Sequence, residues 1–152
     1  MNELPELHFP VRPRLKWKRE GEKLFFWDKR RKKYIRITPE EWVRQNVIAW
    51  LESESYPESL IAVEREMNIL GMSKRFDLVV FDRKNKAFLL VECKRPGVKI
   101  NEDTLHQALV YNRKLNAPYL LLTNGMNHYI CAFDKENHIK FLKQLPPFEQ
   151  YP

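Results

Sequence analysis

The stretch RFDLVVFDRKNKAFLLVECKRP, residues 75–96, decides the fold of this chain. It contains two apolar runs, 76–81 and 87–91, separated by the polar segment DRKNK at 82–86. Two short apolar runs around such a break are typical of a β-hairpin. Because apolar residues occupy both faces of both strands, we expect a sheet that is covered on both sides by helices.

The length of the hairpin turn determines which side chains face one another. With a two-residue turn at Lys84-Asn85, the numbers of paired residues sum to 169, and Asp77 lies opposite Glu92. Carboxylates held about 5 Å apart repel each other, and a bound cation relieves this repulsion. Lys94 shares the face of Glu92 because side chains alternate along a strand. The turn lacks the usual glycine; if it is longer or bulged, the carboxylates converge without being direct neighbours.

The same register assigns the apolar side chains to the two faces of the hairpin. The face of Asp77 is expected to carry the pairs Val79–Leu90 and Phe81–Phe88. The opposite face is expected to carry Phe76, Leu78, Val80, Leu89 and Val91. Charges inside a sheet that is buried on both sides need a partner or a function.

The composition is that of a soluble globular protein, with 43% hydrophobic and 31% charged residues among 152. A chain of this length forms one ordinary domain, and its composition argues against disorder. No apolar run approaches the roughly 20 residues of a membrane span and no secretory signal opens the chain, so we expect a cytoplasmic protein without membrane contact. The net charge of +7 suits a polyanionic partner such as nucleic acid. Cys93 and Cys131 lie in apolar runs and are expected to be buried thiols.

Capping signals place two helices. Residues 38–41 (TPEE) form a capping box that starts a helix ending near Glu54. Asn101 is the N-cap of a second helix that runs to about Leu115. Their buried stripes are expected to be Val43, Val47, Trp50 and Leu51 in the first helix, and Leu105, Ala108, Leu109 and Leu115 in the second.

Further strands surround the hairpin. A strand over 60–70 turns at Gly71 into the hairpin, so that three strands form a meander, but the register does not decide whether Glu64 or Glu66 lies on the face of Asp77. The remaining strands are expected at 118–123, 128–133 and 138–145. The first of these follows a crossover helix and therefore pairs parallel to an earlier strand. The pattern predicts an α/β fold in which helices flank a central mixed sheet.

The basic N-terminal segment is less regular than the rest. We divide the chain into an N-terminal extension, 1–37, and a main domain, 38–152. Residues 23–37 are a candidate hairpin, with its turn at Asp28-Lys29, packed on the core. The basic run at 29–33 is either a solvated turn or a loop that contacts phosphates, since aromatic residues flank it and could stack on bases.

The charged residues at the strand ends suit metal-dependent hydrolysis. Asp77 and Glu92 offer hard oxygen ligands for Mg²⁺ or Mn²⁺. Such an ion polarises a phosphodiester and lowers the pKa of a bound water, while Lys94 positions the water or stabilises developing charge. A Glu-x-Lys pair is most often an exposed charge pair, but this one ends a buried run opposite an aspartate.

The order of elements and motifs resembles the PD-(D/E)XK nuclease superfamily. Asp77 matches its aspartate and Glu92-Cys93-Lys94 its E-x-K element, although Phe76 stands where some members have proline. Longer motifs, over about residues 38–145, resemble the N-terminal nuclease domain of type I restriction enzyme R subunits in a small stand-alone form. These motifs are TPEExVRQ at 38–45, VECKRP at 91–96, Gln107-x-x-x-Tyr111 and TNGxNHY at 123–129.

The resemblance implies a restriction-endonuclease-like αβββαβ core. It implies that Asp77 and Glu92 bind the metal, that Lys94 is the catalytic lysine and that Glu41 is an accessory acid near the site. The expected reaction is Mg²⁺-dependent hydrolysis of DNA. No phosphate loop of the form G-x-x-x-x-G-K-[ST] occurs, so no nucleotide cofactor is expected.

The resemblance also indicates how nucleic acid is bound. Gln107 and Tyr111 are expected beside the active site, where they help to position DNA. Apart from the resemblance, Arg44 and Arg95 are expected to contact the nucleic acid. Arg75, opposite Lys94 in the same register, either contacts a phosphate or merely flanks the hairpin. Two alternatives remain: a non-catalytic nucleic-acid-binding or interaction module on the same fold, and a structural subunit of a restriction or repair assembly. A protein partner or a homodimer is compatible with each.

Overall fold

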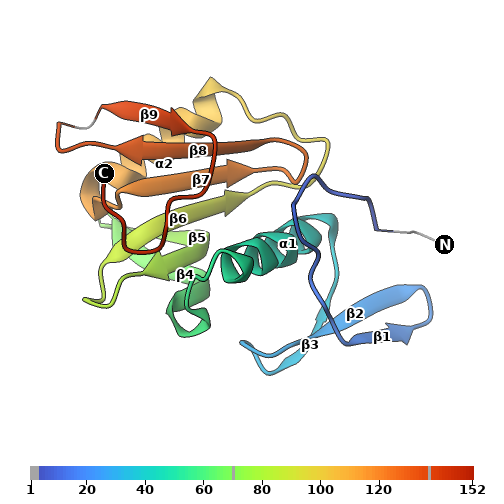
Figure 1. The fold of residues 1–152 in the computed structure, drawn as a ribbon. Coiled ribbons are helices and arrows are strands. Elements are labelled where there is room, and N and C mark those ends of the chain that lie inside the picture. The colour runs from blue at the N-terminus through green and yellow to red at the C-terminus, as the bar shows by residue number, and fades with distance from the viewer. Residues whose placement is uncertain (1–3, 70, 137) are drawn as a thin grey trace.

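The computed structural model describes residues 4–69, 71–136 and 138–152, which form two sheets, two α-helices and one short 3-10 helix (Figure 1). The helices are α1 (Pro39–Ser53), η1 (Glu58–Leu60) and α2 (Glu102–Leu115). The N-terminal sheet consists of β1 (Trp17–Glu20), β2 (Lys23–Asp28) and β3 (Lys33–Arg36). The central sheet consists of β4 (Ile61–Ile69), β5 (Met72–Phe81), β6 (Ala87–Cys93), β7 (Tyr119–Thr123), β8 (His128–Phe133) and β9 (Ile139–Leu142). None of the helices in the described ranges is long and apolar enough to cross a membrane.

The strands of the central sheet follow one another in chain order, β4-β5-β6-β7-β8-β9. β6 and β7 are parallel, because α2 carries the chain back between them, and the other neighbours are antiparallel. The helices α1 and α2 lie on opposite faces of the sheet (Figure 1). This mixed α/β arrangement, with the order αβββαβ from α1 to β7, confirms the expected restriction-endonuclease-like fold.

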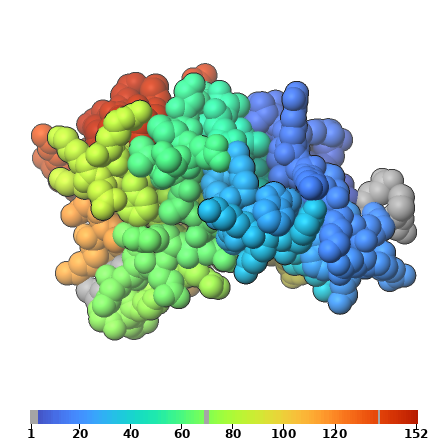
Figure 2. Space-filling view, turned by 90° about the horizontal axis from the view of Figure 1, so that it is seen from below, coloured from blue at the N-terminus to red at the C-terminus, as the bar shows by residue number. Residues whose placement is uncertain are grey.

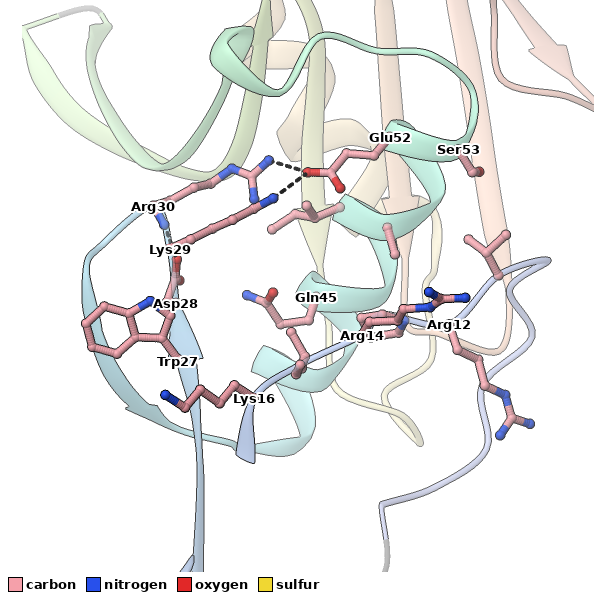
Figure 3. A pocket seen from close by; sticks show the side chains of 15 residues that line it. Arg12, Arg14, Lys16, Trp27, Asp28, Lys29, Arg30, Gln45, Glu52 and Ser53 are labelled. Atoms are coloured by element: carbon pink, nitrogen blue, oxygen red, sulfur yellow. Dashed lines mark hydrogen bonds and ion pairs between the residues drawn. The ribbon is translucent and has the colours of Figure 1, made fainter. Parts of the chain in front are cut away.

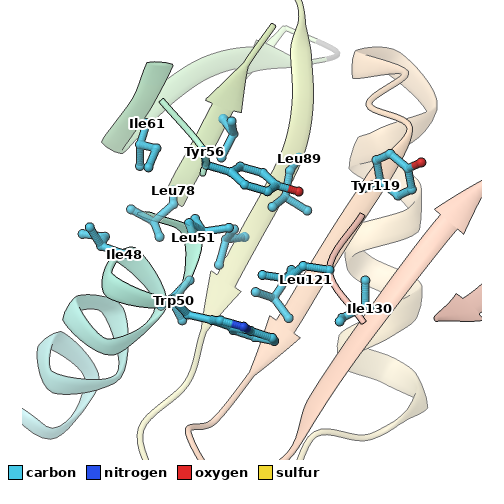
Figure 4. Close-up of a cluster of buried hydrophobic side chains, with 14 of the residues drawn as sticks. Ile48, Trp50, Leu51, Tyr56, Ile61, Leu78, Leu89, Tyr119, Leu121 and Ile130 are labelled. Carbon is cyan, nitrogen blue, oxygen red and sulfur yellow. The ribbon is translucent and has the colours of Figure 1, made fainter. Parts of the chain in front are cut away.

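The core consists of two apolar layers, one on each face of the sheet. In the layer between α1 and the sheet, Leu51 of α1 packs with Leu78 and Leu89 of the sheet, and all three side chains are fully buried (Figure 4). Burying each such side chain stabilises the fold by roughly 1.5–3 kcal/mol. The layer beneath α2 includes Phe76, Val79, Leu90, Leu120 and Leu122. Both cysteines are buried and reduced, as expected.

The register of the β5-β6 hairpin is confirmed in its middle and wrong at its turn. Leu78 pairs with Val91, Val79 with Leu90 and Val80 with Leu89. A bulge then shifts the ladder, so that Phe81 pairs with Ala87 and not with Phe88.

The side chain of Asp82 is the cause of this longer turn. Its Oδ1 accepts hydrogen bonds from the backbone N–H groups of Lys84 (2.8 Å) and Lys86 (2.9 Å). Asn85 takes the left-handed conformation at φ 62°, which a short polar side chain tolerates. The turn therefore spans 82–86, and the two-residue turn is wrong.

A second irregularity lies where the acidic residues are. On β4, Val63 pairs with Leu78 and Arg65 with Phe76, while Glu64 between them has a positive φ of 52°. Phe76 packs in the layer beneath α2, whereas Leu78 packs beneath α1, so the expectation that these two share a face is wrong. The β4-β5 ladder is interrupted at Glu64 and Asp77, and the residues on either side of Asp77 pack in opposite layers.

The N-terminal sheet lies beside α1 (Figure 1). In Figure 2 this sheet and the segment before it form the blue part of the surface. The expected hairpin is present as β2 and β3, with Trp27 paired with Tyr34, and β1 adds a strand that the sequence did not predict. Arg30, in the β2-β3 turn, donates a hydrogen bond of 2.7 Å to Glu52 of α1. Thr38 then caps α1 by accepting the N–H of Glu41, as predicted.

Candidate functional site

A polar cleft of about 290 Å³ lies at the end of the central sheet, between α1 and strands β4, β5 and β6. It is lined by Glu40, Arg44, Glu64, Arg75, Phe76, Asp77, Glu92, Cys93 and Lys94. A smaller pocket of about 50 Å³ continues toward α2 and shares Phe76, Glu92 and Lys94 with the cleft. Gln107 and Tyr111 line this smaller pocket, so α2 brings them next to Glu92 and Lys94.

Asp77 is held from two sides. Its Oδ1 accepts a hydrogen bond of 2.9 Å from Arg44 of α1, and its Oδ2 accepts one of 2.7 Å from the backbone N–H of Cys93. The β5-β6 ladder ends at the pair Leu78–Val91, so the predicted direct pairing of Asp77 with Glu92 is not part of it, and Asp77 contacts Cys93 instead. Asp77 therefore bridges α1 and the end of β6.

Glu92 has a different environment, since one of its oxygens lacks a partner. Oε1 is buried and accepts no hydrogen bond from the residues that the structure describes, and Oε2 lies 3.7 Å from the ammonium of Lys74. Burial, together with the charge of Asp77, raises the pKa of Glu92 to about 7, while Lys74 and Lys94 act in the opposite direction. An uncompensated carboxylate of this kind is stabilised by any cation that enters the cleft.

Lys94 stands at the boundary of the two hollows. The backbone N–H of Lys94 donates a hydrogen bond of 2.8 Å to the carbonyl of Thr123, which ties the end of β6 to β7. Its side chain lines both the cleft and the smaller pocket, and no ion pair engages it within the described residues. The ammonium of Lys94 is thus available to a molecule in the cleft.

Behind Asp77, buried charges connect the cleft to the N-terminal sheet. Arg44 also donates a hydrogen bond of 3.0 Å to Glu41, and Arg31 donates one of 2.5 Å to the same carboxylate. Arg31 is held in turn by Asp28 at 2.6 Å. Burial would lower the pKa of Arg44, but Glu41 and Asp77 raise it overall, so the guanidinium stays charged. Positive and negative groups alternate in the order Asp28, Arg31, Glu41, Arg44, so each of these charges has a neighbour of opposite sign that compensates for its burial.

The structure brings together most, but not all, of the predicted site residues. Arg75 lines the cleft with an exposed side chain, whereas Arg95 is exposed and lies outside both hollows. Glu41 reaches the cleft only through Arg44, because its own side chain is buried in the ion pairs.

Two residues of the cleft were not identified from the sequence: Glu40 was missed and the position of Glu64 was left open. Glu40 faces the cleft, and burial and the nearby Asp77 raise its pKa. Glu64 lies 3.6 Å from Arg44, which settles the open question in its favour, since Glu66 is exposed and pairs with Arg75 on the ladder. No sequence signal marked Glu40, in the first turn of α1, as functional. The positive φ of Glu64, where the β4-β5 ladder is interrupted, leaves no motif either.

The basic run at 29–33 is neither fully solvated nor free for phosphates. Lys29 pairs with Glu58 at 2.8 Å, Arg30 with Glu52, and Arg31 is mostly buried. Three of the five cations of the run therefore attach the hairpin to the rest of the protein. Lys29, Lys32 and Lys33 are exposed, and of these only Lys29 has an ion pair among the described residues.

The donor set of the cleft fits a hard divalent cation such as Mg²⁺. Within the described ranges no group of three or more His, Cys, Asp or Glu side chains is arranged to hold a metal. Mg²⁺ is usually held by only one or two carboxylates and keeps several waters. The unpartnered Oε1 of Glu92, close to Asp77, matches that requirement. Cys93 is not expected to be a ligand, because burial raises the pKa of its thiol well above the ordinary value.

Comparison with known proteins agrees with the resemblance noted in the sequence. A search of the curated proteins found no match. The family model described as type I restriction enzyme R protein N terminus (HSDR_N) matches residues 39–146, which include α1, the central sheet, α2 and every residue of the cleft. The chain therefore belongs to the type I restriction enzyme R protein N-terminal family.

Proposed function

We propose that the protein hydrolyses phosphodiester bonds of DNA with the help of Mg²⁺ or Mn²⁺, as a PD-(D/E)XK nuclease. The observation that carries this proposal is the unpartnered, buried Oε1 of Glu92 beside Asp77, with Lys94 at the same cleft. A buried anionic pair with an elevated pKa is costly unless a cation or a proton compensates it. Membership of a restriction enzyme family supports a nuclease-related role.

In this proposal Asp77 and Glu92 hold the ion. When bound, the ion polarises the phosphodiester and lowers the pKa of a coordinated water. Asp77 keeps its orientation through the N–H of Cys93, while the unpartnered oxygen of Glu92 is free to be a ligand. Lys94, which lacks an ion pair among the described residues, stabilises the charge that develops on the phosphate oxygens.

Arg44 has a dual effect on this site. Its hydrogen bond to Oδ1 of Asp77 stabilises the carboxylate in the absence of a metal, and it competes with a metal for the same oxygen. Arg75 and the pair Gln107 and Tyr111, which line opposite ends of the double hollow, are placed to contact the DNA backbone on either side of the cleavage point. This placement supports DNA positioning by α2.

The alternative is a nucleic-acid-binding or interaction module that lacks turnover and acts within a restriction assembly. The hydrogen bond between Arg44 and Asp77 favours it, because a guanidinium already neutralises one of the two acids. Under this alternative, DNA binding is salt-sensitive and no divalent ion produces cleavage.

The deciding experiment incubates the purified protein with plasmid, linear and single-stranded DNA, in Mg²⁺, Mn²⁺ or EDTA. Cleavage that needs the ion and is lost in Glu92→Gln and Lys94→Ala supports the nuclease. Calorimetric titration with Mn²⁺ should show weaker binding in Asp77→Asn and Glu92→Gln. A matched control is Lys86→Ala, which removes an ammonium from the distant hairpin turn. Equal cleavage by Lys94→Ala and the parent would exclude the proposal.

A further inference from the structure

The excess positive charge of the protein is confined to its N-terminal segment. Residues 1–37 contain 12 Lys and Arg against 5 Asp and Glu, and residues 38–152 contain 15 of each. The whole net charge of +7 thus belongs to the N-terminal segment, which precedes the region matched by the family model. Such an imbalance attracts polyanions to one part of the surface.

The N-terminal sheet has one buried and one exposed face. Phe26 and Asp28 of β2 are buried, at 0% and 4% exposure, whereas Trp27 between them is 41% exposed. Alternation therefore turns the indole of Trp27 to the face of β2 opposite Phe26 and Asp28. Figure 3 shows Trp27 on the side of β2 away from Gln45 of α1, at the rim of a hollow that both residues line. The sheet packs on the protein with one face and offers the other to solvent.

Aromatic and basic side chains alternate on this exposed face. Cross-strand pairing and strand alternation place Phe25, Trp27, Tyr34, Lys18, Lys23 and Arg36 together, and we call this set the aromatic face. The face also carries one carboxylate, that of Glu20, which lies opposite Lys23. The rings of Trp27 and Tyr34 are 5.3 Å apart, and the ammonium of Lys18 lies 5.1 Å from the centre of the Tyr34 ring. Of these cations only Lys18 has an ion pair, with Glu20, among the described residues.

We propose that the aromatic face binds single-stranded nucleic acid, with a base stacked on Trp27 and phosphates on Lys23 and Arg36. Exposed aromatic rings flanked by cations are the features that bind single strands with little sequence preference. A duplex keeps the faces of its bases inside the stack, so only an unpaired base can cover the Trp27 indole. Charge complementarity favours this occupant over a neutral or basic protein surface.

The attachment of the sheet gives this surface a defined place relative to the cleft. The turn between β2 and β3 is held to α1 by the pair of Arg30 with Glu52 and by the pair of Arg31 with Glu41. Glu41 lies directly behind Arg44, which lines the cleft. A nucleic-acid strand bound on the aromatic face therefore lies on a sheet that is attached to α1, the helix that also carries residues of the cleft. Binding on this face does not depend on catalysis.

The test measures the fluorescence anisotropy of a labelled oligo(dT) strand, titrated with the full chain in EDTA so that no cleavage occurs. Trp27→Ala should weaken binding about 5- to 100-fold, and Trp27→Tyr should retain much of it. The matched control is Phe141→Ala, which removes another exposed ring, 56% exposed, on β9. Circular dichroism and thermal unfolding check that each variant is folded.

A second pair of variants tests the phosphate contacts. The double variant Lys23→Gln/Arg36→Gln should reduce the slope of log affinity against log salt by about 1.4, since each contact to a single strand contributes about 0.7. Lys84→Gln/Lys86→Gln, with the same change of charge in the β5-β6 turn, should leave the slope unchanged. Equal affinities for Trp27→Ala and Phe141→Ala, or equal slopes for the two double variants, would overturn the proposal. Duplex DNA or heparin bound with the same dependence on Trp27 would overturn it too. Because every measurement is made without metal, a failure of the nuclease assay leaves this result intact.

Discussion

Arg44 on α1 donates a hydrogen bond of 2.9 Å to Asp77 on β5. This bond joins a helix to the acidic end of the sheet across 33 residues of chain. It makes the first helix part of the candidate site, because the orientation of a proposed metal ligand depends on a side chain that is not itself a ligand.

Replacing Arg44 should destabilise the protein. Arg44→Gln leaves Glu41 and Asp77 without their shared cation, and removing one partner from a buried ion pair costs roughly 3–5 kcal/mol. Arg44→Lys should recover only part of this, because an ammonium cannot bridge two carboxylates as a guanidinium does. Urea unfolding gives the free energies, with Arg65→Gln as an exposed control. A loss no larger than that of Arg65→Gln would contradict the structure.

Arg31 should matter more than its neighbour Arg30. Arg31→Gln removes the cation between the buried Asp28 and Glu41, whereas Arg30→Gln removes only the pair with the partly exposed Glu52. We expect a lower melting temperature and weaker Mn²⁺ binding in Arg31→Gln, since the support of Arg44 and Asp77 is lost. If both variants bind Mn²⁺ like the parent, the N-terminal sheet does not position the cleft.

Lys94→Ala should abolish cleavage and preserve the fold. Loss of a group that stabilises transition-state charge typically costs 10²- to 10³-fold in rate. The ammonium of Lys94 has no ion pair among the described residues, so little native-state stability should depend on it. Rates on plasmid DNA, together with melting temperatures, separate the two effects. A parallel drop in both quantities would mean that the lysine is structural.

Glu92 should make the metal-free protein less stable as the pH rises. Its pKa is about 7 in the folded protein, against 4.5 ordinarily, so the folded state binds the proton more tightly. The contribution of this proton to the free energy of unfolding is complete below about pH 4.5 and is lost as the pH rises through about 7. The loss is on the order of 2–3 kcal/mol. Urea unfolding in EDTA at pH 5 and pH 8 measures it. Glu92→Gln should flatten the profile, while Glu66→Gln, at an exposed position, should not.

Local patterns in the sequence were sufficient for the elements of the fold. Two apolar runs around a polar break identified β5 and β6, and the TPEE motif identified the start of α1. The crossover helix implied that β7 runs parallel to an earlier strand, which is β6. These features depend on neighbours within a few residues, which is why they can be read without a structure. The strand β1 was missed because its four residues are all exposed and carry no apolar alternation.

The sequence by itself determined the αβββαβ order, the buried hairpin and the residues Asp77, Glu92 and Lys94 at its end. Only the tertiary structure decided how the charges are compensated: Arg44 and Cys93 hold Asp77, while Oε1 of Glu92 is left without a partner. It also decided that Arg31 is buried behind Glu41, whereas Trp27 is exposed on the aromatic face. The physical reason is that strand alternation is a local property, whereas ion pairing and exposure depend on which distant segments pack together. Local irregularities such as the positive φ of Glu64 and the bulge at Val80 and Phe81 also leave no motif.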